Sequence, residues 1–310
     1  GIRGLIVTGV QTCALPIFYR DWLVHIVHRL KLELLKQRYL HIDETHVQVL
    51  KEPGRKNTSD SYMWVYCSIR DAVNPIRYFE YQPGRSGKYP EAFLREYEGY
   101  IHTDAYSGYN AVSGVKRCLC YTHLRRAFVD ALPKDIHNSE ASKPAEAILR
   151  LNQLFNIESE LEALPPDQKK KERLIREKPL LEAFWSWAEK SAIGELPKSK
   201  LSKAFHYALN NREGFWNYLE DGNCSISNSL AENCIRPFVI GRKNWLFSGS
   251  PKGAEASAGI YTLVETAKAN GLAPMKYIKY ILSDMPGSAF LEHPEYLDDY
   301  LPWNRLVKEF

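Results

Sequence analysis

The 310-residue sequence has few cysteines, no long apolar run and little excess of either charge. Its six cysteines are scattered and lack the density and regular spacing of a disulfide framework in a small secreted protein. No stretch approaches the roughly 18 consecutive apolar residues of a membrane span. These absences argue against a disulfide-stabilised secreted domain and against a membrane-spanning protein, and they favour a reducing, cytoplasmic location.

The charge and composition of the chain constrain its partner only weakly. The net charge is +4 and the pI is about 8.6, which is compatible with a polyanionic partner but too small to predict one. With 45% hydrophobic and 25% charged residues, the chain is globular and long enough for one large domain or two smaller ones. Motifs must therefore decide the function.

The first residues imitate a secretory signal, because one early arginine precedes an apolar stretch. We interpret them differently, since "VTGVQTCALPI" at 7–17 resembles the translation of a common sequencing adaptor. We therefore treat 1–17 as an artefactual segment and exclude it from reasoning about the fold. The authentic protein is expected to begin near Phe18 here and to have begun earlier in its intact form.

Hydrophobic periodicity predicts the first helix and strands. Apolar residues four apart predict an amphipathic helix at 18–37. Runs rich in β-branched and aromatic residues at 38–50, 61–70 and 76–82, joined by short polar turns, predict an antiparallel meander. A further strand is predicted to stop at Asp104, and a fifth at 116–123 runs into a helix.

The predicted order is three strands, a helix, a strand, a helix and a further strand, the layout of the ribonuclease H-like fold. We therefore expect an α/β protein with a mixed five-stranded sheet flanked by helices. Strand signals vanish between the fifth strand and a late acidic motif, which predicts an all-helical insertion there. The expected parts are an N-terminal helix at 18–37, a first core part at 38–130, the insertion at 131–225 and a second core part at 226–310.

Three carboxylates are candidates for one site. Asp43 lies within the first strand and Asp104 ends the fourth, so a mixed sheet can place the two strands side by side. The segment Asn228–Arg236 is predicted to be a helix stopped by Pro237, with Glu232 on the edge of its apolar face. Each residue also has an ordinary explanation: an edge aspartate, a helix cap and a surface ion pair, respectively.

The chain resembles the catalytic part of an insertion sequence 66 family transposase. The resemblance rests on motifs in the family's order, namely "HIDETHVQVL", "GYIHTDAYSGY", "CYTHLRRAF", "NSLAENCIRPFVIGRKNWLFSG" and "YTLVETAKANGLAP". It implies that Asp43, Asp104 and Glu232 are a catalytic triad that binds Mg²⁺ or Mn²⁺ and acts on the DNA ends of a mobile element. It also implies a bacterial, nucleoid-associated protein, target DNA as second substrate, a homo-oligomeric active complex and possible accessory proteins.

Such a site explains a carboxylate within a buried strand. Hard divalent cations take oxygen ligands, and two of them can support an in-line phosphoryl transfer. Water would release a 3′-hydroxyl at the element's end, and that hydroxyl would then attack target DNA. Alternation along the strand places Glu44 on the face opposite Asp43, which suggests a structural role for Glu44.

Residues after the fourth strand are further candidates. Cys120 and His123 have a spacing that could suggest zinc, but two more ligands at suitable spacing are not evident. The same Cys-x-x-His spacing resembles a signature of related transposase families, which implies a supporting role for His123 at the scissile phosphate. Arg125 and Arg126 follow on a helix and are interpreted either as DNA contacts or as a solvated surface.

A basic stretch follows the acidic motif. Its members are interpreted as DNA contacts, because cationic and amide groups hold phosphates and an indole can stack on a base. The alternative is a surface loop whose tryptophan packs in the core. The residues are Arg236, Arg242, Lys243, Asn244 and Trp245.

Two other functions stay open at this point. A glycoside hydrolase also uses paired carboxylates, but it needs no metal, so its activity would survive EDTA. A catalytically inactive DNA-binding remnant of a transposase would bind DNA in a salt-sensitive manner without cleaving it. Within the insertion, the lysine-rich run at 167–178 is interpreted as a solvated helical face, and the tryptophans as packing residues.

Overall fold

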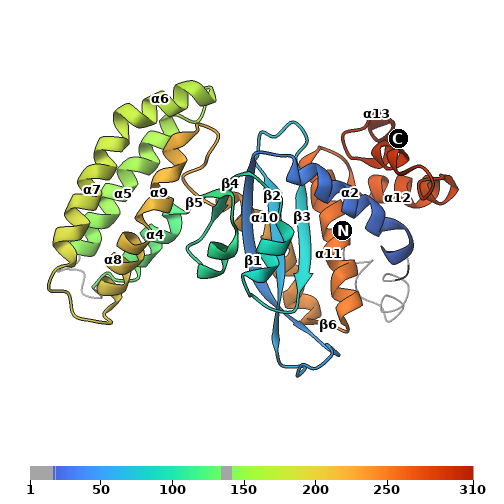
Figure 1. Ribbon diagram of the computed structural model, residues 1–310, viewed down its shortest axis with the longest axis horizontal. Helices are drawn as coiled ribbons and strands as arrows, with labels where there is room; N and C mark the ends of the chain where they lie inside the picture. Colours follow the sequence, from blue (N-terminus) through green and yellow to red (C-terminus); the bar gives the residue numbers. More distant parts are fainter. Residues whose placement is uncertain (1–16, 18, 134–141, 310) are drawn as a thin grey trace. The chain divides into compact units, whose positions relative to one another are not determined.

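The computed structural model describes residues 17, 19–133 and 142–309, and it divides the chain into two compact units (Figure 1). Unit 1 comprises Gly1–Glu98, Gly108–Ser113 and Leu230–Phe310, and unit 2 comprises Gly99–Ser107 and Gly114–Ser229. The protein is α/β, with six strands in the described part of the chain. Apart from residue 17, the segment interpreted as artefactual lies outside the described residues.

The strands of unit 1 form the predicted antiparallel meander. Strand β2 (Asp60–Ser68) lies between β1 (Tyr39–Val49) and β3 (Arg77–Gln82) and pairs with each in antiparallel fashion. A short strand that was not predicted, β6 (Phe247–Ser248), pairs in parallel with the end of β1. The prediction of five strands was therefore one short.

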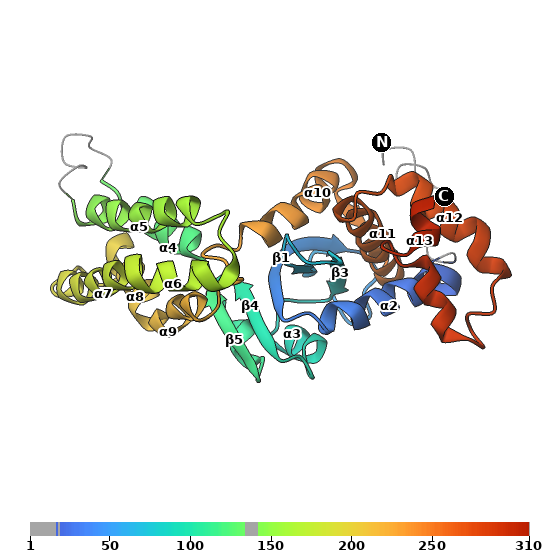
Figure 2. The same ribbon diagram turned by 90° about the horizontal axis from the view of Figure 1, so that it is seen from above.

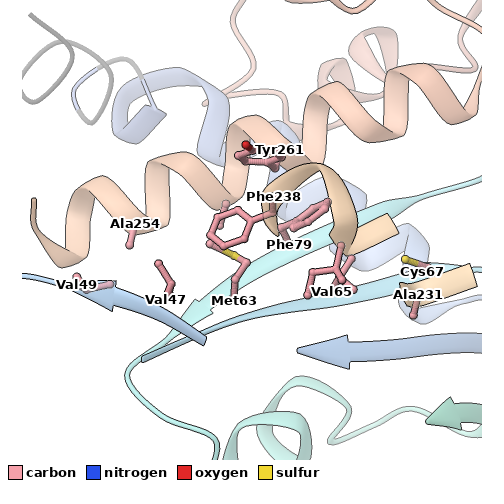
Figure 3. Close-up of a cluster of buried hydrophobic side chains, with 12 residues drawn as sticks. Val47, Val49, Met63, Val65, Cys67, Phe79, Ala231, Phe238, Ala254 and Tyr261 are labelled. Carbon is pink, nitrogen blue, oxygen red and sulfur yellow. The ribbon is translucent and has the colours of Figure 1, made fainter. Parts of the chain in front are cut away.

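Two helices cover one face of this meander, α10 (Ser229–Trp245) and α11 (Pro251–Ala269). Figure 3 shows the buried side chains between them and the strands. Thr262 and Thr266 of α11 accept hydrogen bonds from the backbone N–H groups of Phe79 (2.8 Å) and Arg77 (3.1 Å) in β3. Helix α11 is thus fixed to the strand by packing and by polar contacts together.

The opposite face carries α2 (Val24–Leu35) and α3 (Lys88–Phe93), as Figure 2 shows, and the π-helical turn η2 (Tyr19–Leu23) leads into α2. Tyr66 of β2 stacks on Phe93, with ring centroids 3.6 Å apart. The predicted apolar stripe of α2 is confirmed, since Ile26, Leu30 and Leu34 are buried. The remaining elements of unit 1 are α12 (Pro274–Asp284), η6 (Met285–Gly287), η7 (Pro294–Tyr300) and α13 (Arg305–Glu309).

Unit 2 joins a strand pair to a helical bundle. Parallel strands β4 (Gly99–Thr103) and β5 (Val115–Leu119) are connected through the 3-10 helix η3 (Ser107–Ala111). The bundle has an aromatic core, in which Trp185 is fully buried and the rings of Phe128 and Phe205 are 5.4 Å apart. Its elements are α4 (Tyr121–Val129), α5 (Lys143–Glu160), α6 (Pro166–Arg176), α7 (Lys178–Ala192), α8 (Lys200–Asn210), α9 (Arg212–Trp216) and η5 (Asn217–Glu220).

None of the described helices in either unit is both long and apolar enough to cross a membrane.

The prediction that Pro237 stops the late helix was wrong, because α10 continues through it to Trp245. Proline removes one N–H, whose partner would have been the carbonyl of Asn233, and Asn233 is exposed to water. Beyond the proline, Phe238 is fully buried against α11 and the strands. The burial of this second half offsets the lost hydrogen bond.

Candidate active site

Asp43 lies in the middle of β1 and points to the face that α10 and α11 cover. It pairs with Val65, which belongs to the buried cluster on that face. Its Oδ1 accepts the backbone N–H of Glu44 at 2.9 Å. Burial is the main cause that raises the pKa of the nearby Cys67 thiol, with smaller effects from Cys234 and from the Asp43 charge. Asp43 therefore lies near Cys67 and the helix that carries Cys234.

Glu232 lies in the first turn of α10, also in unit 1. Its neighbours Ala231 and Ile235 are buried in the cluster with Cys67, and Figure 3 shows Ala231 beside Cys67. Cys234, two residues further, hydrogen-bonds to Cys67, which lowers the pKa of the Cys234 thiol. The turn that carries Glu232 thus lies over the same face of the β1–β2 ladder as Asp43.

Glu44 occupies the opposite face of β1, as alternation predicted. Its side chain is only 2% exposed, and its carboxylate accepts hydrogen bonds from Arg85 Nε (2.6 Å) and from the hydroxyl of Tyr109. The Tyr109 ring packs edge-on against Trp64. Glu44 therefore holds the loop of Arg85 and the η3 helix against the strands.

Asp104 follows β4 in unit 2 and is held by a local turn. Its Oδ1 accepts the backbone N–H of Tyr106 at 3.0 Å, an Asx turn that fixes the direction of the side chain. Its backbone carbonyl accepts Arg117 Nη2 at 2.6 Å. Arg117 also donates to Thr103 Oγ1 (2.8 Å) and to the carbonyl of Tyr106 (2.8 Å). This Asx turn lies just before η3 and holds the Asp104 side chain locally.

Sequence reasoning missed two residues around Asp104. Arg117 of β5 braces its loop, and Tyr207 of α8 lies near its carboxylate. Burial is the largest cause that raises the pKa of the Tyr207 hydroxyl, and the Asp104 charge is the next. No sequence signal marked Tyr207, because it comes about 100 residues later, within the predicted all-helical insertion.

The other candidates of unit 2 lie on α4. His123 is half-buried in the first turn, where its backbone N–H donates to the carbonyl of Cys120 at 3.2 Å. Arg125 Nε donates to Asn152 Oδ1 of α5 at 2.7 Å, so this arginine links two helices. Arg126 is exposed.

A buried cluster of a histidine and two cysteines was also missed. Donor atoms of His102, Cys118 and Cys224 lie within 4.8 Å of one another, a set that soft metals can use. His102 Nε2, however, accepts the backbone N–H of Ser225 at 2.9 Å, and a hydrogen bond from Cys118, together with burial, raises the pKa of the Cys224 thiol. The cluster therefore fastens the segment before α10 to β4 and β5.

The basic stretch beyond Glu232 is only partly exposed. Arg236, Lys243 and Asn244 are exposed. Arg242 donates to Thr45 Oγ1 at 2.9 Å and so holds the end of α10 on β1. Trp245, the last residue of α10, packs edge-on against Phe238 at 5.3 Å and is partly buried.

Comparisons with known proteins point to one family. The family model described as transposase, IS66 family, matches residues 10–256. The uncharacterized proteins y4hP and y4qI of Sinorhizobium fredii (strain NBRC 101917 / NGR234) are each 28% identical, over 85% and 92% of this chain and over 50% and 55% of their own lengths. A third protein of that strain, y4jD, is 25% identical over 91% of this chain and 57% of its own length. The chain thus spans about half the length of these relatives, and no solved structure matches it.

Proposed function

Because the chain belongs to the IS66 transposase family, we propose that it cuts DNA at the ends of an insertion sequence and joins them to target DNA by metal-dependent phosphoryl transfer. The observation that carries this proposal is local to unit 1. Asp43 and the turn of Glu232 share one face of the β1–β2 ladder. We propose that Asp104 completes the triad and that the core is ribonuclease H-like.

The donor chemistry of these residues fits Mg²⁺ or Mn²⁺. All three side chains offer carboxylate oxygens, the ligands that hard divalent cations prefer. When bound, such ions supply Lewis-acid activation of the attacking oxygen and stabilise the leaving oxygen. The protein contributes orientation: the N–H of Glu44 fixes Asp43, and the Tyr106 N–H fixes Asp104.

The surrounding cations would hold DNA. We propose that His123 contacts the scissile phosphate and that exposed Arg126, Arg236 and Lys243 contact other phosphates. Two element ends must be joined, so we propose an active complex of two or more copies, with accessory proteins of the element as further partners. A cytoplasmic, nucleoid-associated location belongs to the same proposal.

The test is cleavage of labelled oligonucleotide duplexes that carry an element end. We expect nicking that needs Mg²⁺ or Mn²⁺ and falls by about 100-fold or more in Asp43→Asn, Asp104→Asn and Glu232→Gln, since each removes an anionic ligand of the ions that would stabilise charge at the reacting phosphate. Glu96→Gln removes an exposed carboxylate of unit 1 and is the matched control. DNA binding without cleavage in the unmodified chain would support the inactive remnant, and activity that survives EDTA would overturn the metal mechanism.

A second measurement tests metal binding without DNA. Fe²⁺ bound in place of Mg²⁺ generates hydroxyl radicals when ascorbate and peroxide are added, and these cut the polypeptide near the ion. We expect cuts close to residues 43, 104 and 232, and their loss in Asp43→Asn. Cuts confined to other segments would contradict the proposed ligand set.

A further inference from the structure

Two loops lie side by side at one end of unit 1. The β1–β2 connection, 50–59, leaves β1 where β6 pairs with it, and β6 belongs to the connection between α10 and α11 (Figure 1). The ladder pairs Gln48 with Phe247 and Val49 with Ser248, and the backbone N–H of Leu50 donates to the carbonyl of Ser248 at 2.9 Å. The two loops are therefore neighbours at this end of the sheet, and Lys243 lies in the last turn of α10, just before the second loop.

The β1–β2 loop is held rigidly from beneath. The side chain of Glu52 is only 3% exposed and accepts hydrogen bonds from Ser61 Oγ (2.6 Å), Arg55 Nη1 (2.7 Å) and the hydroxyl of Tyr81. Arg55 Nη2 also donates to the carbonyl of Asp60 at 2.9 Å. A buried polar network therefore fixes the conformation of this loop.

Each loop contains a non-glycine residue in the left-handed region. Lys51 has φ 59° and Leu246 has φ 63°. The N–H of Lys51 donates to Asn57 Oδ1 at 3.0 Å, which helps to hold this conformation. Such residues cost about 1–3 kcal/mol each and persist where the surroundings enforce them, most often at functional sites.

The surface presents cations beside apolar side chains. Lys51, Lys56 and Lys243 are exposed, and in the described part of the chain their ammonium groups have no carboxylate partner. Leu246 is 64% exposed and Phe247 is 45% exposed. We call these five residues the hairpin surface.

We propose that the hairpin surface binds a DNA strand next to the cleaved end, an inference that rests on the proposed function. The lysines contact phosphates, and Phe247 stacks on an unpaired base at the end, with Leu246 beside it. Charge of one sign fits the phosphate backbone, and an exposed aromatic ring fits the face of any base. The Glu52 network already holds the backbone of the β1–β2 loop, so little backbone entropy of this loop is lost on binding.

The charge is tested by salt dependence of binding. The full chain is titrated with a fluorescent duplex whose end is frayed by three mismatched pairs, and anisotropy gives Kd at several salt concentrations. In the triple variant Lys51→Gln, Lys56→Gln, Lys243→Gln we expect the slope of log Kd against log salt to fall by about 2–3, because each phosphate contact contributes roughly 0.7–0.9. The control Lys276→Gln, Lys279→Gln, Lys308→Gln removes the same charge from exposed positions of unit 1 and should leave the slope unchanged.

Stacking is tested with Phe247→Ala. We expect Kd for the frayed duplex to rise by about 5- to 100-fold, since loss of the stacking of one base on an aromatic side chain weakens binding by about this factor. Kd for a fully paired duplex should stay unchanged. Phe247→Tyr keeps an aromatic face and should retain the affinity for the frayed end.

The outcomes separate this inference from the proposed function. If the triple variant keeps the unmodified slope while Asp104→Asn abolishes cleavage, the hairpin surface is wrong and the function stands. If the variants reduce self-association in sedimentation velocity and leave DNA affinity intact, the surface joins copies of the chain and the DNA inference is overturned. If the unmodified chain binds no DNA, both are overturned.

Discussion

Glu177 is a fully buried carboxyl in unit 2, and the structure predicts that it is protonated at neutral pH. Its Oε2 accepts the hydroxyl of Tyr218 at 2.7 Å, whereas its Oε1 is buried without a hydrogen-bond donor. Burial first, and then the negative charge of Glu158, raise the pKa of Glu177 from 4.5 to about 8. When protonated, the carboxyl O–H of Glu177 donates a hydrogen bond to Glu158. The Glu158 carboxylate accepts two hydrogen bonds from Arg173, at 2.5 and 2.8 Å, and pairs with Lys169 at 3.4 Å.

The raised pKa makes stability fall as pH rises. The unfolded chain releases this proton near pH 4.5, but the folded chain keeps it until about pH 8, so folding takes up a proton between these values. The stability that protonated Glu177 contributes is fully present below pH 4.5. It is lost as pH rises toward the folded pKa of about 8, at about 1.4 kcal/mol per pH unit. Between pH 5.5 and 7.5 the free energy of unfolding should therefore drop by about 2–3 kcal/mol. Hydrogen bonds from Arg173 hold the pKa of Glu158 low, so Glu158 stays ionised and adds no slope in this window.

The measurement is urea unfolding at pH 5.5, 6.5, 7.5 and 8.5, followed by tryptophan fluorescence, to which Trp185 and Trp187 of the same bundle contribute. In Glu177→Gln the amide is uncharged at every pH, and its N–H can donate to Glu158 as the proton does. We expect this variant to lose most of the slope and to be more stable than the unmodified chain at pH 8.5. Glu182→Gln removes an exposed carboxylate from α7 and should keep the slope.

Equal slopes in the unmodified chain and in Glu177→Gln would refute the reasoning. That result would mean that Glu177 is already ionised in the folded state at neutral pH. Water or a rearranged Arg173 would then have to stabilise its charge, and the arrangement of these buried side chains would need revision.

Three further predictions follow from single contacts. Gly241→Ala should lower the free energy of unfolding by about 1–3 kcal/mol, because the added Cβ would lie 2.5 Å from the hydroxyl of Tyr261. Urea denaturation measures this free energy, and an unchanged value would contradict the close packing of α10 on Tyr261. Thr262→Val should cost about 1–3 kcal/mol in the same assay by leaving the buried N–H of Phe79 without an acceptor, whereas Thr262→Ser should cost less. Arg117→Lys should slow DNA cleavage by about 10- to 100-fold with little change in DNA affinity, because lysine cannot reproduce the several hydrogen bonds of Arg117 to the loop of Asp104. Equal cleavage rates would show that these hydrogen bonds are dispensable.

Alternation along the strands was readable from the sequence and carried real information about the site. The polar turns fixed the limits of β1, β2 and β3, and the period of two assigned Asp43 and Glu44 to opposite faces. The structure bears this out through the partners of Glu44 on one face and the buried cluster on the other. The local sequence was enough to predict which face of the strand each side chain occupies, because side chains alternate between the two faces along a strand.

Features set by distant partners were not readable. Arg173 was assigned to a solvated helical face because it lies among lysines and glutamates, yet it is fully buried. Its guanidinium pairs with Glu158 and donates to the carbonyls of Tyr218, Asp221 and Cys224. The continuation of α10 through Pro237 was missed for the same reason, because the gain comes from packing that no local rule contains.

The candidate site divides in the same way. Asp43, Asp104 and Glu232 stood out because they lie within motifs, and their chemistry could be argued from residue type. Arg117, which braces the loop of Asp104, and Tyr207, which lies near the Asp104 carboxylate, come from other elements and gave no signal. Similarity of sequence finds a residue within a motif more readily than it finds the side chains around it.

Buried polar contacts in unit 2 fix the segment that follows α9. Arg173 gathers the carbonyls that follow α9, and His102 receives the N–H of Ser225. The N–H of Tyr121 donates to the carbonyl of Ile226, and the N–H of Asn228 donates to Cys120 Sγ. The chain is thus fixed up to the residue before α10, and Glu232 follows within one helical turn. Because these contacts are buried and come from several elements of unit 2, the path of the chain through 218–228 is set by tertiary partners rather than by its local sequence.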